Sequence, residues 1–480
     1  MRRIPACIAA ILLCLGCVPN VRISGETGTQ PPVFPDYTDV TVPANIAPLN
    51  FRYLGDEVSA LLLDAGGRRC TVKGPVFDIP LDTWRVLTAA GDITARVCIK
   101  GKDGWKAFRP FTIHVSPDRI DPYVAYRLIE PGYETWNRLG IYQRCLEDFT
   151  QTPVMTNEDT DRNCMNCHSF CNRDPGKMMF HMRARNGGTY TWNDGRIEKL
   201  NTKTPQTLSA LVYPRWHPSG KYIGFSVNDI AQFFHSTNPN RIEVYDSVSD
   251  VVVYDVENHR ISTSPLLTDS TRLETMPAWS PDGRTLYFCS SAQPKMPEGY
   301  RDIRYSIRSI AFDPDSFSFG DRIETVYDAM ASGKDATFPR VSPDGRFLLF
   351  AETGYGCFAI WHKDAELRMI DLQDGTLHDL DGVNGPDADS YHCWSSNSRW
   401  IIWASRRLDG LYSRLFIAHI DENGTPSKPF LLPQRDPGLN ELLTRSFNVP
   451  EFITGPVSFD PGEMALIART DPGIDVTFKE

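Results

Sequence analysis

The sequence lacks several features, and each absence narrows what the chain can be. After residue 17 it contains no run of 18 apolar residues, so the mature chain is not expected to cross a membrane as a helix. It has only 12 cysteines in 480 residues, too few for a disulfide-dense scaffold. Its net charge of −10 argues against a general nucleic-acid binder. No G-x-S-x-G, H-E-x-x-H or Walker A pattern assigns a hydrolase or nucleotide-binding function.

The residues that are abundant favour a strand-rich protein. The chain has 36 prolines, 34 glycines, 25 phenylalanines, 18 tyrosines and 10 tryptophans. Proline and glycine favour turns, whereas aromatic residues favour strands. The length allows two or three domains of ~100–200 residues each.

The first 17 residues resemble a bacterial lipoprotein signal. Arg2 and Arg3 precede a short apolar run, and Gly16 precedes Cys17, the expected lipidation site. Cys14 departs from the leucine that such signals usually carry, and an ordinary secretory signal is the alternative. We expect residues 1–17 to be removed, residues 18–37 to be a flexible linker, and the protein to be lipid-anchored in the periplasm, at the outer membrane.

Two segments follow the linker. Residues 38–118 alternate polar and apolar side chains in short runs, which predicts an immunoglobulin-like β-sandwich. Residues 119–150 carry apolar positions at helical spacing, which predicts a helical connector.

A short tag recurs in the second half of the chain. WHPSGKYIGFS begins at Trp216, WSPDGRTLYFCS at Trp279, VSPDGRFLLFAE at Val341 and WSSNSRWIIWAS at Trp394. Each tag predicts a tight turn that leads into a buried strand, and one such unit cannot cover both of its faces alone. The tags resemble those of TolB-type β-propellers. This resemblance implies a propeller over residues 178–480, with six blades as the family norm, although only four tags are visible.

The sequence Cys164-Met165-Asn166-Cys167-His168 matches the C-x-x-C-H motif of c-type haem attachment. Chance predicts roughly 0.006 occurrences from the cysteine and histidine counts. We therefore predict one covalent haem c on a segment spanning residues 151–177, outside the propeller ring, with His168 as an iron ligand. A disulfide between Cys164 and Cys167, a zinc site with Cys171 and a histidine, and a thioredoxin-like redox pair are the alternatives.

The second axial ligand is expected on the stretch that follows. His181 is the favoured residue, and the methionines in this stretch (Met178, Met179 and Met182) come next. A five-coordinate haem that binds an external ligand remains a further alternative.

The combined pattern resembles a group of exported Bacteroidota proteins that join a C-x-x-C-H motif to a TolB-like propeller. They are often labelled cytochrome c biogenesis proteins. The residues that carry the resemblance include Pro175, His181, Gly187-Gly188, Trp394-Ser395 and the run from Asn448 to Phe452. The resemblance implies a haem protein but does not name its reaction.

Polar residues near the fourth tag are candidates for a binding funnel at the propeller mouth. They are His362, Asp389 and His392, and capping of turns is the structural alternative for each. The leading expectation is a monohaem cytochrome that transfers electrons or senses redox state, working with a redox or envelope protein partner and leaning away from enzyme activity. A non-redox propeller binding protein and a haem-dependent propeller enzyme are the other candidates.

Overall fold

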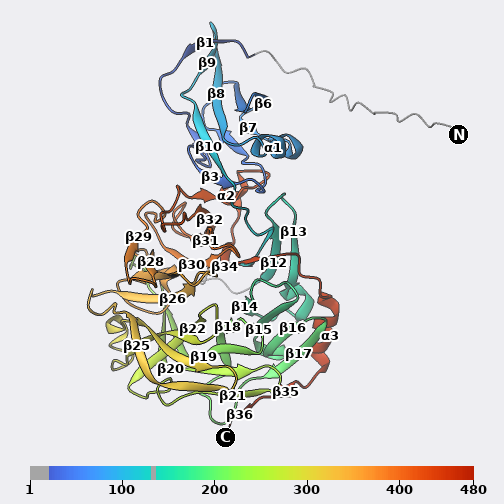
Figure 1. The fold of residues 1–480 in the computed structure, drawn as a ribbon. Coiled ribbons are helices and arrows are strands. Elements are labelled where there is room, and N and C mark those ends of the chain that lie inside the picture. The colour runs from blue at the N-terminus through green and yellow to red at the C-terminus, as the bar shows by residue number, and fades with distance from the viewer. Residues whose placement is uncertain (1–20, 131–136, 480) are drawn as a thin grey trace, which may run out of the picture.

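The computed structural model of the chain describes residues 21–130 and 137–479, which form an N-terminal sandwich and a larger propeller. Figure 1 shows the sandwich in blue, beside β32 (Arg414–His419) and α2 (Leu439–Leu442) of the propeller. The predicted signal peptide and Cys17 lie outside the described residues. Within the described ranges, no helix is long and apolar enough to cross a membrane.

The prediction of an N-terminal β-sandwich is confirmed, because two sheets face each other across a shared apolar core. The ring of Phe51 lies 6.2 Å from that of Phe111 in the other sheet and 5.1 Å from that of Phe77 in its own. The larger sheet contains β1 (Ile23–Glu26), β3 (Thr41–Pro43), β5 (Ser59–Ala65), β6 (Arg68–Lys73), β8 (Ile93–Gly101), β9 (Gly104–Ala107) and β10 (Phe111–Ser116). The smaller sheet contains β2 (Val33–Phe34), β4 (Phe51–Tyr53) and β7 (Val76–Phe77), and α1 (Leu81–Thr88) accompanies them.

The predicted flexible linker over residues 18–37 is wrong for most of its described part. Strand β1 pairs in parallel with β9, and β2 pairs with β4. Tyr37 is buried, and its hydroxyl donates a hydrogen bond of 3.1 Å to the carbonyl of Leu431 in the propeller. Strand pairing provides hydrogen-bond partners for backbone N–H and C=O groups of this segment. Its Gly- and Pro-rich composition instead predicted turns whose backbone groups face solvent.

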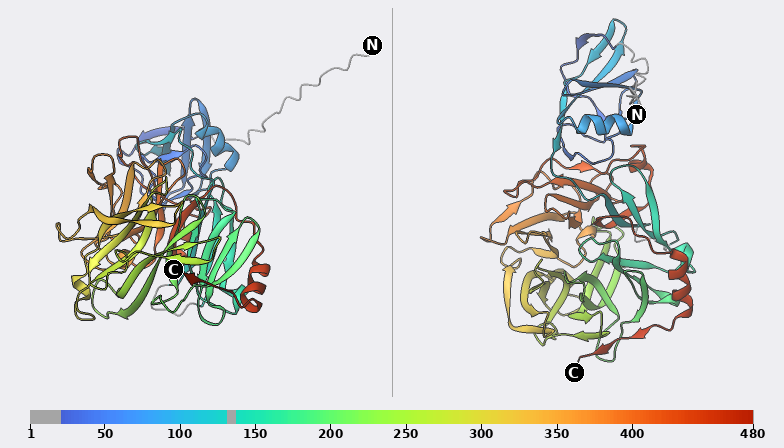
Figure 2. Two further views of the ribbon diagram at one scale, coloured as in Figure 1. Left: turned by 60° about the horizontal axis from the view of Figure 1, so that its bottom comes forward. Right: turned by 45° about the vertical axis from the view of Figure 1, so that its right-hand side comes forward.

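The propeller consists of small antiparallel sheets arranged in a ring (Figure 2). In five of these sheets the chain runs outward through consecutive strands, and we name each sheet by its first, innermost strand. They are β14 (Met165–Phe170) with β15 (Lys177–Met182), β16 (Gly188–Asn193) and β17 (Arg196–Asn201); β18 (Leu211–Trp216) with β19 (Tyr222–Phe234), β20 (Ile242–Asp255) and β21 (Arg260–Ser262); β22 (Arg272–Trp279) with β23 (Thr285–Ala292), β24 (Ser306–Asp313) and β25 (Ser318–Tyr327); β26 (Asp335–Val341) with β27 (Phe347–Thr353), β28 (Glu366–Asp371) and β29 (Leu377–Asp379); and β30 (Asp389–Trp394) with β31 (Trp400–Ser405), β32 and β33 (Phe430–Leu431).

The sixth sheet joins distant parts of the chain and closes the ring. Its inner strand β34 (Ser446–Ile453) pairs antiparallel with β11 (Tyr123–Ile129), which is followed outward by β12 (Gly140–Cys145) and β13 (Gln151–Thr156). After β34, helix α3 (Pro461–Thr470) leads into β35 (Ile474–Asp475) and β36 (Thr477–Phe478). These last two strands pair with β17 and β21, so the C-terminal segment straps two neighbouring sheets.

The predicted helical connector over residues 119–150 is wrong, because its two apolar stretches are strands β11 and β12. Strand β11 lies between β12 and β34, and the side chains on each of its two faces pack into a different apolar cluster. A strand covered on both faces loses the polar–apolar alternation, so its apolar run can be mistaken for a helix. The propeller therefore begins at Tyr123 and not at residue 178.

The tags form the predicted tight turns at the ends of inner strands. In the second tag the backbone N–H of Gly283 donates to the carbonyl of Ser280 at 2.9 Å, and Gly283 has a φ of 71°. In the degenerate fourth tag Ser398 takes the glycine position with a φ of 61°, and its N–H donates to Ser395 at 3.1 Å. The turn geometry is thus kept although the Pro-Asp-Gly sequence is lost.

The closing strand gives a test of the fold. Phe452 on β34 is fully buried and lies opposite Val124. We expect Phe452→Ala to lower the free energy of unfolding by about 3–5 kcal/mol, because the cavity it leaves lies where the ring closes. Urea denaturation followed by tryptophan fluorescence measures the change. Leu442→Ala is the control, since its side chain is 75% exposed and the substitution should change stability by less than about 0.5 kcal/mol. Equal effects of the two substitutions would contradict the closure.

Candidate functional site

Each inner strand of the propeller contains one residue in the left-handed backbone region. These residues are Cys167 (φ 55°), Tyr213 (φ 50°), Met276 (φ 53°), Phe338 (φ 56°), Tyr391 (φ 51°) and Val449 (φ 49°). The pairing register shifts beside each of them, so each marks a β-bulge. A left-handed conformation costs a residue other than glycine of order 1–3 kcal/mol, and such strain concentrates at functional sites.

All six bulge residues line one cavity of about 60 Å³ in the centre of the propeller. The other lining residues follow the bulges on the same strands: His168, Pro214, Arg215, Pro277, Arg340 and His392. The residue directly after the bulge is proline in four strands and histidine in the other two, β14 and β30. The cavity is therefore built from one repeated backbone element contributed by every sheet.

The C-x-x-C-H motif belongs to this repeated element. Cys167 takes the bulge position of β14 and lines the cavity, and His168 takes the position that proline has elsewhere. Cys164 precedes β14 and is buried in the apolar cluster that contains Met155 and Met182. The prediction that the motif lies outside the ring is wrong, because β14 is an inner strand.

The two histidines predicted to ligate iron lie on opposite faces of the β14 sheet. His168 packs 6.2 Å from Phe170, which belongs to the apolar cluster shared with the β34 sheet. His181 packs 6.0 Å from Phe225 of the β18 sheet, and its Nδ1 lies 2.9 Å from the hydroxyl of Thr189. The sheet separates the two rings, so in this structure they do not face a common iron.

Both imidazoles are held neutral. Burial, and then the nearby charges of Arg127 and Arg215, lower the pKa of His168 to about 3. Burial and Arg183 lower the pKa of His181 to about 3. Each ring keeps one buried nitrogen, Nε2, that finds no hydrogen-bond partner in the described chain. A neutral imidazole with a free nitrogen could bind a metal or accept a hydrogen bond.

The residues do not fit a haem as they stand. Pockets for drug-sized ligands have volumes of roughly 300–1,000 Å³, whereas the cavity at Cys167 has about 60 Å³. The Cys164 thiol is buried in a side cluster, while Cys167 lines the cavity. Nor do His, Cys, Asp and Glu side chains form any group of three or more that could hold a metal within residues 21–130 and 137–479. Cys164, Cys167 and Cys171 are all unpaired thiols.

Of the three predicted funnel residues, only His392 lines the central cavity. Its Nε2 lies 3.0 Å from the carbonyl of Leu349, and burial lowers its pKa to about 4. Asp389 is buried and paired with Arg407 at 2.6 Å, and it accepts a hydrogen bond from Nε1 of Trp403, so its role is structural.

His362 holds a loop across one end of the channel. The loop joins β27 to β28, and Phe358 within it packs 5.8 Å from Tyr213 and 6.2 Å from Phe338. Nε2 of His362 lies 3.1 Å from Oε2 of the buried Glu243 on β20, and this contact ties the loop to the β18 sheet. The tyrosine and phenylalanine that Phe358 touches are bulge residues, so the loop covers the cavity on that side.

Of the six bulge residues, only Cys167 was predicted as a site residue from the sequence, whereas Tyr213, Met276, Phe338, Tyr391 and Val449 were not. The sequence does contain a pattern that identifies these bulges. Each bulge residue lies three residues before the aromatic or apolar residue that begins a tag or the equivalent segment. The matching segments are YPRW, MPAW, FPRV, YHCW and VPEF, with CHSF as the β14 version. Extending the tags upstream would therefore have placed Cys167-His168 among the repeats.

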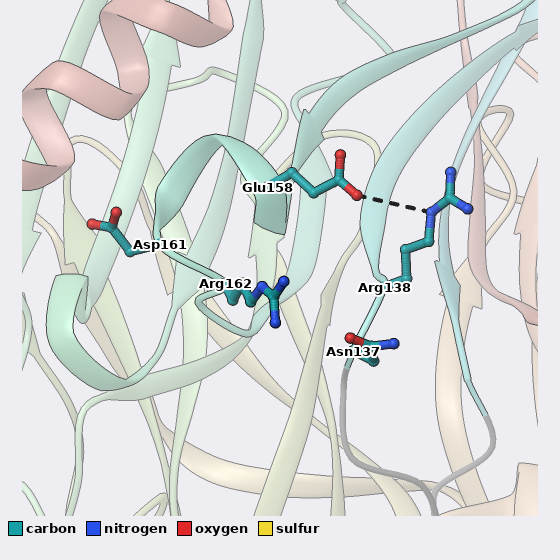
Figure 3. Close-up of a pocket in the computed structure, with 5 residues that line it drawn as sticks. All are labelled: Asn137, Arg138, Glu158, Asp161 and Arg162. Atoms are coloured by element: carbon teal, nitrogen blue, oxygen red, sulfur yellow. Dashed lines mark ion pairs between the residues drawn. The ribbon is translucent and has the colours of Figure 1, made fainter.

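A second pocket lies on the surface, near the start of β14. It has a volume of about 510 Å³ and is lined by Asn137, Arg138, Glu158, Asp161 and Arg162 (Figure 3). Nε of Arg138 is 3.9 Å from Oε1 of Glu158, and both side chains are about 70% exposed. An exposed ion pair of this kind contributes little to stability or binding. This surface pocket therefore assigns no function.

Comparisons with known proteins give only distant likenesses. No protein-family model and no curated protein matches the chain. A Mycobacterium tuberculosis puromycin-hydrolysing peptidase is 13% identical with a TM-score of 0.35, over 72% of this chain and 52% of that one. The periplasmic gluconolactonase of Pseudomonas aeruginosa is 12% identical with a TM-score of 0.35, over 65% of this chain and 96% of that one. The tricorn protease is 10% identical with a TM-score of 0.33, over 80% and 43%. The chain thus spans about half the length of the peptidase, and no function is taken from these likenesses.

The buried His392 predicts a specific pH dependence of stability. The unfolded chain takes up a proton near the ordinary histidine pKa of ~6.5, whereas the folded chain resists protonation down to about pH 4. The stability linked to His392 is therefore present above about pH 6.5 and is lost as the pH falls towards 4. The free energy of unfolding of His392→Gln should therefore fall by up to about 3 kcal/mol less than that of the wild type between these pH values. Urea unfolding at several pH values measures the difference. His378→Gln on β29 is the control and should follow the wild type, and a His392→Gln profile parallel to the wild type would contradict the burial.

Proposed function

We propose that the chain is a binding protein of the bacterial envelope that holds a small ligand in the central channel of its propeller. The observation that carries this proposal is the cavity to which all six inner strands contribute a strained bulge residue. A cavity built by every sheet has a fixed shape, because it cannot change without disturbing the whole ring. Concave sites with a few polar groups among apolar walls are the usual form of small-molecule sites.

The composition of the cavity supports binding of a ligand with both polar and apolar parts. Met276, Phe338 and Val449 provide apolar wall, whereas Arg215 and His392 provide polar groups. The loop that carries Phe358 covers the side where the inner strands begin. The opposite side, near the tag turns, is where Arg340 and Cys393 are partly exposed, so we place the entrance there.

A monohaem cytochrome stays a prediction of the sequence motif and is the second candidate. The observation that favours it is the buried, partnerless Nε2 of His168 beside the cysteine pair. The small cavity and the opposed His181 argue against it. We also propose, on the motif and the tags, that the chain belongs with the exported Bacteroidota propeller proteins that it resembles.

The channel can be tested through Cys167, a residue that lines the cavity and is partly exposed. We expect iodoacetamide, which has only five heavy atoms, to alkylate Cys167 in the folded protein, and at least one compound from a library of small metabolites to protect it. Peptide mass spectrometry measures the modification of each cysteine separately. Cys98, which is fully buried in the sandwich, is the internal control and should not react. A library in which nothing protects Cys167 would contradict the proposed site, and a haem bonded to this thiol would support the cytochrome instead.

The envelope location is a separate proposal that rests on residues 1–17. Cys17→Ser should remove the acylated residue and release a soluble protein, since stable anchoring depends on the acyl chains. Membrane fractionation with metabolic labelling by palmitate measures this. Cys7→Ser is the matched control, because it also removes a cysteine of the signal segment and should leave anchoring intact. Unlabelled wild-type protein that fractionates like Cys17→Ser would contradict the anchor.

A further inference from the structure

The cavity wall contains two arginines that no carboxylate neutralises closely. Arg215 on β18 and Arg340 on β26 both line it. Nη1 of Arg215 is 3.9 Å from Oε2 of Glu451, beyond hydrogen-bond distance, and its Nε is buried without a partner in the described chain. Nη1 of Arg340 donates to the carbonyl of Pro339 at 2.6 Å, and Arg340 makes no ion pair within the described ranges. Arg340 is a partly buried guanidinium group without an ion-pair partner in the described chain, and Arg215 has one long ion pair, so the two groups together favour an anionic ligand.

The nearest carboxylate is already engaged elsewhere. Oε1 of Glu451 accepts a hydrogen bond of 2.9 Å from the backbone N–H of Phe170, and burial raises the pKa of this carboxyl group. Arg173 is a third guanidinium close enough to lower that pKa, and its Nε donates to the carbonyl of Trp394 at 2.9 Å. Arg215 and Arg173 therefore share the Glu451 carboxylate, and Arg340 adds a further positive charge to the cavity wall, which leaves a local excess of positive charge.

The rest of the cavity restricts the size and character of the ligand. A water molecule needs ~10–15 Å³ of cavity volume, so about 60 Å³ holds a group of about four to six heavy atoms. Met276, Phe338 and Val449 line it with apolar side chains next to the arginines. A ligand that contacts both the arginines and the apolar side chains needs a planar anionic group and a short aliphatic chain.

We propose that the cavity binds a short-chain aliphatic carboxylate of about two to four carbons. Its carboxylate lies between Arg215 and Arg340, because planar guanidinium groups match carboxylate geometry with paired N–H donors. Its alkyl chain packs against Met276 and Phe338. This inference rests on the proposed binding function and names the chemical class of the ligand.

Butyrate is the probe for the experiment, with full-length mature protein. Isothermal titration calorimetry should give a dissociation constant of about 1 mM or tighter for wild type, as a six-atom ligand allows. Arg340→Gln should weaken binding about tenfold or more, because a charge-assisted hydrogen bond is lost. Arg322→Gln is the matched control, since Arg322 is 80% exposed on β25 and pairs with Glu324 away from the cavity. It should bind butyrate as wild type does.

Two further probes separate charge from shape. 1-Butanol has the same chain without the charge and should not bind measurably. Hexadecanoate is too long for the cavity and should not protect Cys167 from iodoacetamide. Butyrate should protect Cys167 in the wild type and in Arg322→Gln, but not in Arg340→Gln at the same concentration. Equal binding of butyrate by wild type and Arg340→Gln would overturn the assignment to this cavity.

The outcomes also distinguish this inference from the proposed function. If butyrate does not bind but an uncharged metabolite protects Cys167, the carboxylate proposal fails and the binding channel stands. If no compound protects Cys167, both fail. Arg340→Gln is readable in each case, because its native circular dichroism and its unfolding midpoint show whether the variant folds.

Discussion

The pairing of β34 with β11 is the constraint on which the rest of the molecule depends. The two strands are separated by more than 300 residues, and their register runs from Tyr123 opposite Ile453 to Ile129 opposite Ser446. A ring of sheets buries each face against a neighbour only when the last sheet meets the first. The chain meets this requirement by completing its last sheet with strands from just after the sandwich.

Within the ring, three inner strands are each bonded to the inner strand of the preceding sheet through a tryptophan side chain. Nε1 of Trp216 donates to the carbonyl of Ser169 at 3.2 Å, that of Trp279 to Arg215 at 3.0 Å, and that of Trp394 to Arg340 at 3.1 Å. Each of these bonds joins an inner strand to a strand of the preceding sheet. Two of the three acceptor carbonyls belong to the arginines of the cavity. The tags that identify the fold in the sequence therefore also fix the backbone that presents Arg215 and Arg340 to the channel.

The sequence predicted the repeated part of the fold well and its irregular part poorly. The tags at Trp279 and Val341 contain the glycine that a tight turn requires, so the strands that follow these turns could be predicted. Strand β11 could not, because burial on both faces removed the alternation that identifies a strand. The C-x-x-C-H motif was wrongly predicted to lie outside the ring, because local spacing cannot show that Cys167 is the bulge residue of an inner strand. That position depends on pairing between β14 and β15, and on five equivalent strands elsewhere in the chain.

Cys167-His168 forms part of the channel wall, and Cys167 carries a free thiol. The mass of the peptide that contains residues 164–168 tests this most directly, in mature protein purified from an exporting host that attaches haem to other proteins. We expect an unmodified peptide and no haem absorption in the intact protein. A peptide bearing haem on Cys164 and Cys167 would contradict it and would require the inner end of the β14 sheet to open.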